Sequence, residues 1–133
     1  MSVVVRSARE ADRESVQRLL LACGWDRPRV ADPQLFAALY AASSRSVVAD
    51  DDGTIIGYVR AITDGVSNGY IQLTAVAPTH RRRGIGRRMV EQLIGDDDRI
   101  TWVLRAGRDG AKEFWESVGF VPSAIAMERL RRP

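Results

Sequence analysis

The chain has 133 residues, a hydrophobic fraction of 45 % and a formal net charge of +3, which is typical of one soluble globular domain over residues 1–133. No apolar run reaches the roughly 20 residues that span a bilayer, and Met1–Arg6 lacks a signal-peptide pattern, so we expect a cytoplasmic protein without a membrane partner. The single cysteine, Cys23, and the single histidine, His80, exclude an intrachain disulfide and argue against a zinc site or a histidine-based hydrolase, so we predict no metal site.

The first half of the chain predicts two helices between strands. Ser7 and Glu10 have the spacing of a capping box, and the helix after them carries Val16, Leu19 and Leu20 on one face. Asp32-Pro33 is typical of a helix start, and Asp52-Gly53 predicts a β-hairpin turn. The elements expected here are a strand over 2–7, a helix ending near Cys23, a helix over 33–42 and strands over 45–50 and 54–62.

The second half alternates strands with helices. Apolar residues recur at helical spacing between Gly84 and Ile94, and again between Asp109 and Val118. The expected strands are 70–77, 100–104 and 125–130. The whole order, β-α-α-β-β-β-α-β-α-β, predicts an α/β fold. Its sheet should be mixed and twisted, antiparallel first and partly parallel later, with helices on both faces, and should open between strands 70–76 and 100–104.

The most informative segment is Leu73–Gly86, which predicts a strand, a glycine-bearing turn and an amphipathic helix. Backbone N–H groups at such a helix start favour phosphate, and the arginines at 81–83 add donors for phosphate oxygens. The P-loop pattern is absent because no Lys-Ser or Lys-Thr occurs. The dinucleotide fingerprint is incomplete because Met89 stands where its third glycine belongs. The segment therefore indicates a different pyrophosphate loop.

Two motifs now resemble one family. Arg81-Arg82-Arg83-Gly84-Ile85-Gly86 is similar to the Gln/Arg-x-x-Gly-x-Gly/Ala signature of the GNAT (Gcn5-related N-acetyltransferase) superfamily. The later stretch from Ala111 to Phe120, with Phe114-Trp115 and Gly119-Phe120, resembles the family's Ala-x-x-Phe-Tyr-x-x-x-Gly-Phe hallmark. The resemblance implies a GNAT-type fold and an N-acetyltransferase that moves an acetyl group from acetyl-CoA directly to a primary amine, most simply of a small molecule, although a protein amine also fits.

The resemblance further implies which residues bind the cofactor. The amides of the loop would hold the pyrophosphate of acetyl-CoA, the strand edge would pair with its pantetheine arm, and the Val76 amide would polarise the thioester carbonyl. The cofactor-binding residues implied in this way are Thr74, Ala75, Val76, Arg81, Arg82, Arg83, Gly84, Ile85, Gly86, Arg87, Asp109, Ala111, Phe114 and Trp115.

The general acid and base do not follow the family pattern. Many relatives protonate the leaving thiolate with a tyrosine, and Trp115 occupies that position here. Either another hydroxyl replaces it, with Ser117 or a strand tyrosine such as Tyr70 as candidates, or the thiolate leaves unaided, or the protein is weak or inactive. For the base, the strand offers Gln72 in place of a glutamate, and Asp64 could act through water.

These departures leave a second function open, a catalytically silent CoA-binding module with a regulatory role. A nucleic-acid partner is not expected, because aromatic residues are not interleaved with the arginine cluster at 81–83. A homodimer through the strand that contains Met127 fits the fold class. The sequence specifies neither the acceptor, nor the preferred acyl group, nor the oligomeric state.

Overall fold

A computed structural model describes residues 2–132 of the chain. Five strands, two short 3₁₀ turns and five helices follow one another along it. They are β1 (Val3–Ser7), η1 (Glu10–Asp12), α1 (Arg13–Ala22), α2 (Pro28–Ala31), α3 (Pro33–Ala41), β2 (Arg45–Asp51), β3 (Thr54–Thr63), β4 (Asn68–Val76), η2 (Pro78–His80), α4 (Ile85–Ile94), β5 (Thr101–Leu104) and α5 (Ala111–Ser117).

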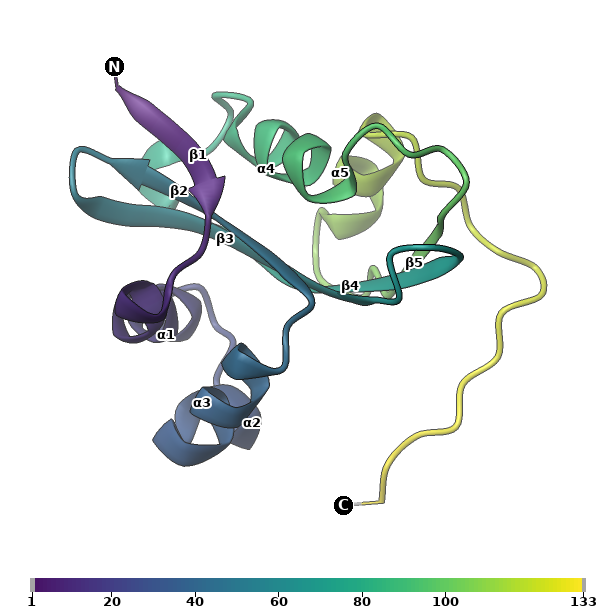
Figure 1. The fold of residues 1–133 in the computed structure, drawn as a ribbon, viewed down its shortest axis with the longest axis horizontal. Coiled ribbons are helices and arrows are strands. Elements are labelled where there is room, and N and C mark those ends of the chain that lie inside the picture. Colours follow the sequence, from purple (N-terminus) through teal and green to yellow (C-terminus); the bar gives the residue numbers. More distant parts are fainter. Residues whose placement is uncertain (1, 133) are drawn as a thin grey trace.

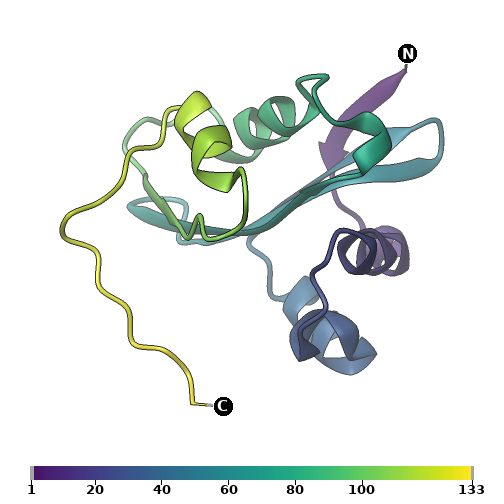
Figure 2. The same ribbon diagram turned by 180° about the vertical axis from the view of Figure 1, so that it is seen from behind.

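The strands form one mixed sheet in the order β1-β2-β3-β4-β5. The first four are antiparallel neighbours, and β5 pairs with β4 in parallel. Helices α4 and α5 lie on one face of the sheet, and α1, α2 and α3 lie on the other (Figures 1 and 2). The predicted mixed sheet with helices on both faces is therefore confirmed.

Local signals explain two of the element boundaries. The Asp32 carboxylate accepts hydrogen bonds from the amides of Gln34 (2.9 Å) and Leu35 (3.0 Å), which caps α3 as its sequence predicts. In the β2–β3 turn, Asp52 and Gly53 have φ angles of 51° and 95°, the left-handed conformation that a tight hairpin needs.

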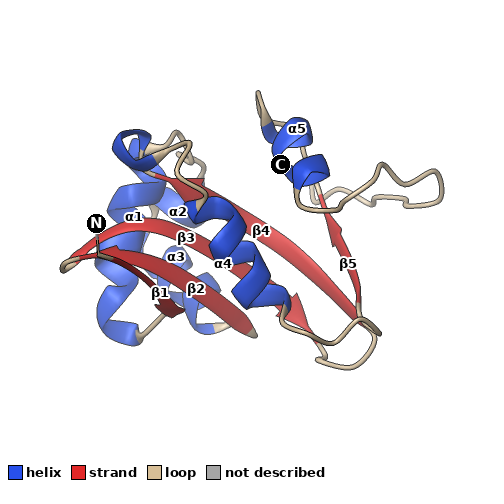
Figure 3. Cartoon of the chain, turned by 90° about the horizontal axis from the view of Figure 1, so that it is seen from above, coloured by secondary structure: helices blue, strands red, loops and turns tan. Residues whose placement is uncertain are grey.

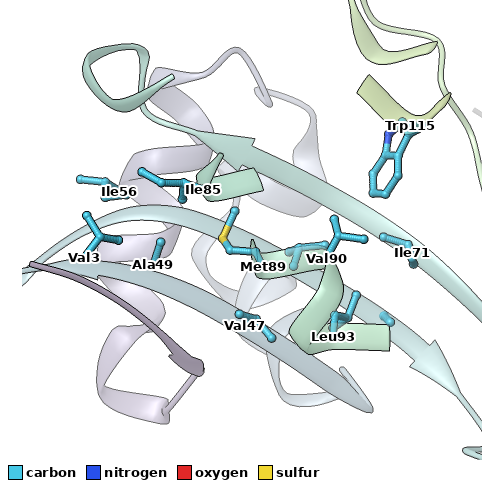
Figure 4. Close-up of a cluster of buried hydrophobic side chains, with 12 residues drawn as sticks. Val3, Val47, Ala49, Ile56, Ile71, Ile85, Met89, Val90, Leu93 and Trp115 are labelled. Atoms are coloured by element: carbon cyan, nitrogen blue, oxygen red, sulfur yellow. The ribbon is translucent and has the colours of Figure 1, made fainter. Parts of the chain in front are cut away.

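Two apolar clusters hold the helices to the sheet. On one face, Met89, Val90 and Leu93 of α4 pack on β2, β3 and β4, and Trp115 joins them from α5 (Figure 4). On the other face, α1 and α3 pack around Tyr58 of β3. Each helix therefore buries its apolar stripe against the sheet, which is what the helical periodicity predicts.

The structure corrects several predicted boundaries. The predicted capping box at Ser7 is wrong, because Ser7 still belongs to β1 and the carboxylate of Asp12 instead accepts the Arg9 amide at 2.8 Å. Helix α2 was not predicted. The predicted strand 125–130 is also wrong: the segment has no regular structure, and Ile125 and Met127 are 90 % and 95 % exposed. No helix within residues 2–132 is long and apolar enough to cross a membrane.

Candidate functional site

A cavity of about 600 Å³ opens where β4 and β5 separate. The two strands pair only through Asn68–Ile71 and Thr101–Leu104, and they then diverge toward their C-terminal ends (Figure 3). Three segments surround the space between them: the loop into α4, the start of α5 and the loop after α1. The lining residues are Cys23, Trp25, Thr74, Ala75, Val76, His80, Arg81, Arg82, Gly84, Ile85, Gly86, Arg87, Arg108, Asp109, Gly110, Ala111, Phe114, Trp115 and Ser117.

The loop into α4 and the first residues of that helix line this cavity. Arg82 and Gly84 both have left-handed backbones, with φ angles of 64° and 75°. The N-cap residue of α4 is Gly84, which has no side chain that could cap the helix. The first amides of an α-helix lack partners within the helix, and the helix dipole favours an anion beside them. This loop and helix start can therefore hold a phosphate group.

The loop is anchored to the β2–β3 hairpin. His80 Nε2 lies 2.7 Å from Asp51 Oδ2, and its Nδ1 lies 2.7 Å from the hydroxyl of Thr79. The Ala77 amide also donates to the carbonyl of Ile56 at 2.8 Å. His80 therefore acts as an anchor for the loop, and these contacts fix the loop before a ligand arrives.

A β-bulge in β4 creates the opening. Tyr58 faces Ala75 and Arg60 faces Gln72, so that Val59 alone lies opposite both Leu73 and Thr74. Leu73 has a φ of 57°, which is uncommon for a residue with a branched side chain. The extra residue bends the strand away from β5 and reverses which side chains face each side of the sheet. From Gln72 onward, β4 has no partner strand on its β5 side within the described chain.

The backbone of Val76 faces the cavity. The Val76 carbonyl and the Ala77 N–H belong to the same peptide group, and in a trans peptide they point in opposite directions. Because the Ala77 N–H points to β3, the Val76 carbonyl points to the open side. The Val76 N–H points to the same side, because the N–H and C=O of one extended residue are parallel. The carbonyl already accepts Arg81 Nε at 2.9 Å, with Cys23 Sγ 3.8 Å away.

Helix α5 forms the far wall. A Cβ added to Gly86 would meet the ring of Phe114 at 2.9 Å, so glycine is needed for α4 and α5 to approach this closely. Trp115 is 7 % exposed and packs edge-on against Phe114 and Phe120, with ring centroids 5.0 and 5.2 Å apart. The Ser117 hydroxyl donates to the carbonyl of Phe114 at 2.5 Å. Both predicted aromatic positions therefore line the cavity, and Trp115 is also part of the core.

The arginines predicted to bind phosphate divide into different roles. Arg81 turns toward Val76, and Arg87 donates to the Ser117 carbonyl at 2.5 Å, which ties α4 to α5. Arg82 is exposed at the mouth of the cavity. Arg83 is not among the described residues that line the cavity. Of the arginines that line the cavity on this loop, Arg81 and Arg87 are therefore engaged in contacts within the chain.

The structure adds residues that the sequence motifs missed. Arg108 Nη2 donates to the Cys23 carbonyl at 2.6 Å, and its guanidinium lies 4.3 Å from the centroid of the Trp25 ring. This contact joins the loop after α1 to the loop before α5, two segments 85 residues apart in the chain. No local sequence pattern signals such a contact.

Asp64 and Tyr70, the other candidate catalytic residues, do not belong to the cavity wall as described. The Asp64 carboxylate accepts the amides of Val66 and Ser67, both at 2.8 Å, and the Ser67 hydroxyl at 2.6 Å in the β3–β4 turn. These hydrogen bonds hold the pKa of Asp64 well below its usual range, which disfavours a role as a base. Tyr70 lies on the opposite face of the sheet from α4, beside Arg105.

Comparisons with known proteins agree on one family. A model of the acetyltransferase (GNAT) family matches residues 10–120. A GNAT-family acetyltransferase from Streptococcus pneumoniae superposes with a TM-score of 0.78 at 20 % identity, covering 99 % of this chain and 100 % of that one. An acetyltransferase from Clostridium acetobutylicum, solved with acetyl-CoA, gives a TM-score of 0.74 at 17 % identity over 97 % and 96 % of the two chains.

A third similar structure is glucosamine-6-phosphate N-acetyltransferase from Arabidopsis thaliana, with a TM-score of 0.66 at 17 % identity over 98 % of this chain and 99 % of that one. At these identities the structural matches establish the fold alone. Comparison with curated protein sequences gave no significant match.

Proposed function

The chain belongs to the GNAT acetyltransferase family, and we propose that it transfers an acetyl group from acetyl-CoA directly to the primary amine of a small molecule. The observation that carries this proposal is the arrangement of one cavity. The uncapped N-terminus of α4 and the unpaired edge of β4 border the same space, at the point where β4 and β5 separate. An extended ligand with a phosphate at one end fits this arrangement.

The residues present fit acetyl-CoA. A Cβ built at Gly84 meets no atom within 4 Å, so the backbone there is open to a close approach by phosphate. The amides that follow Gly84 would bind the pyrophosphate, and Arg82 would add a charged donor. The N–H groups on the open edge of β4, up to Val76, would pair with the amide-containing pantetheine arm as a neighbouring strand does.

When bound, acetyl-CoA supplies an acyl thioester that a neutral amine can attack. The protein's own contribution would be to position this group and to donate a hydrogen bond from the Val76 N–H to the acyl oxygen, where negative charge develops. Trp115 cannot protonate a leaving thiolate, because an indole N–H is not an acid and this ring is packed between two phenylalanines. The Ser117 hydroxyl is already donated to Phe114. We therefore favour departure of the thiolate without a protein acid.

Calorimetry with acetyl-CoA tests the cofactor site. The variant Gly84→Glu places a carboxylate where the pyrophosphate would lie, and we expect at least a tenfold loss of affinity, about 1.4 kcal/mol. Gly65→Glu is the matched control, because Gly65 has a φ of 74°, also has open space around it, and lies in the β3–β4 turn away from the cavity. Backbone strain and added charge are thus the same in both variants.

Three outcomes separate the candidate functions. Binding lost only in Gly84→Glu, together with thiol release and an acetylated product on a panel of amines, supports the enzyme. Binding lost only in that variant, with no turnover on any amine, supports the silent CoA-binding module. Equal affinities of the two variants, or no binding by the folded wild type, would contradict the proposed cofactor site.

A further inference from the structure

Arg60 is a buried cation with no counter-charge among residues 2–132. The residue is 3 % exposed in the middle of β3 and forms no ion pair with a carboxylate of residues 2–132. Its Nε donates to the Ser43 hydroxyl at 2.8 Å, and its Nη1 donates to Oε1 of Gln72. Both acceptors are neutral. A guanidinium has five N–H donors, and these two hydrogen bonds use only two of them.

Such an arrangement is costly to folding. Burial lowers the pKa of Arg60, because the surrounding protein solvates its positive charge poorly. Tyr58, its neighbour on the same face, provides no compensating negative charge, because burial raises the pKa of its hydroxyl to about 12. A buried charge usually has a partner of opposite sign. A buried charge without one suggests that the partner comes from outside the chain.

Arg60 lies at the border of an uncovered part of the sheet, which we call the open face. This face is defined by Ile62, Tyr70 and Val103, which lie directly opposite one another on β3, β4 and β5. Ile62 and Val103 are 50 % and 42 % exposed. Helices α1 and α3 pack on a different part of this face, around Tyr58 of β3 and around Leu73 and Ala75 of β4 (Figures 1 and 2). Arg105, whose guanidinium lies 5.9 Å from the ring centroid of Tyr70, is paired with the carboxylate of Glu128.

The open face leads to the cavity along β4. Gln72, which contacts Arg60, is separated only by the bulge residue Leu73 from Thr74, which lines the cavity. Two residues of strand span about 7 Å. Because the bulge turns these two side chains to opposite sides of the sheet, a ligand that reaches both would pass the edge of β4 that is unpaired beyond Ile71. The oxygen of Gln72 occupies the place that a ligand oxygen would take on the guanidinium.

We propose that Arg60 binds an anionic group of the acceptor, so that the substrate is a small amine that also carries a carboxylate or a phosphate. This inference rests on the proposed acetyl transfer. The anion would displace or join the Gln72 amide oxygen on the Arg60 guanidinium.

Matched acceptor pairs test the proposal. We would measure kcat/KM with 4-aminobutyrate against 4-aminobutanamide, and with 2-aminoethyl phosphate against 2-aminoethanol. The wild type should prefer the anionic member by at least tenfold. Arg60→Met should reduce that ratio to below threefold, and Arg60→Lys should restore part of it. Arg99→Met is the control, because it removes the same charge from a side chain that is 83 % exposed. Acetyl-CoA affinity reports separately on whether each variant retains its cofactor site.

A second readout does not depend on turnover. The melting temperature of the wild type should rise with 4-aminobutyrate and not with its amide, and Arg60→Met should lose this difference. Equal kcat/KM values for both members of each pair in the wild type would overturn the proposal while leaving acetyl transfer intact. An anion preference that persists in Arg60→Met would overturn it too. If no amine is acetylated, the proposed function fails, and the melting shifts alone decide whether Arg60 binds an anion.

Discussion

Replacing Gly69 with alanine should loosen the attachment of β5 to the sheet. A Cβ at this position would lie 2.2, 2.4 and 3.0 Å from three carbons of the Trp102 ring, directly across the β4–β5 pair. Normal carbon contacts are about 3.5–4.0 Å, so the ring or the strand must move by about 1 Å. Overpacking of this kind costs roughly 1–3 kcal/mol, and the lower backbone entropy of alanine in the unfolded chain offsets about 0.5–1 kcal/mol of it. We expect a net loss of about 1–2 kcal/mol.

Urea denaturation followed by circular dichroism measures this loss without relying on the fluorescence of the displaced tryptophan. Gly107→Ala is the matched control, because its Cβ meets no atom within 4 Å and its backbone is not left-handed. That variant should change stability by less than about 0.5 kcal/mol. The double variant Gly69→Ala/Trp102→Leu should lose less than the sum of the two single variants, by about 1 kcal/mol or more. The reasoning would be refuted if the two stability losses were additive, or if Gly69→Ala had the same free energy of unfolding as the wild type.

Two further predictions concern charge and catalysis. Asp12→Asn should lower stability by about 1–2 kcal/mol near pH 7, because Arg6 donates to both carboxylate oxygens at 2.8 and 3.0 Å and the pair is mostly buried. The Arg6 hydrogen bond lowers the pKa of Asp12 in the folded state, so this stability is complete above pH 4 and is lost as the pH falls through that lowered value. Urea midpoints of both proteins from pH 2 to 8 check this, and a constant difference down to pH 2 would be inconsistent with it. Ser117→Ala should retain kcat within about threefold, because the hydroxyl is committed to Phe114, whereas a loss beyond tenfold, or 1.4 kcal/mol, would identify Ser117 as the missing acid.

The parts of the fold that depend on short-range signals could be predicted from the sequence. The cap at Asp32, the hairpin turn at Gly53 and the glycine turn before α4 each require particular residue types at particular backbone conformations. The cavity lining also contains most of the residues implied by the two motifs. These features are local, so the residues within a few positions along the chain are enough to predict them.

The features that were missed depend on distant partners or on unusual conformations. The alternating apolar residues around Ile125 and Met127 predict a strand, but a strand forms only when a neighbour pairs with it, and here both side chains remain exposed. Leu73 gives no sign that it adopts a left-handed backbone, since leucine rarely does so. The burial of Arg60 was equally hidden, because an arginine in a strand usually indicates a solvent-facing position.

The bulge at Leu73 would let a single strand serve both proposed substrates from opposite sides. Before it, Tyr70 and Gln72 face the side of the proposed acceptor, and after it, Thr74 and Val76 face the side of the proposed cofactor. Substitutions upstream can thus retune acceptor choice while the donor half stays untouched. Deleting one residue at the bulge would invert this division, because every later side chain would exchange faces. The strand therefore tolerates exchange of residues far better than a change in its length, and natural variation in acceptor preference should appear as substitutions at residues 70 and 72 without gaps between residues 70 and 76.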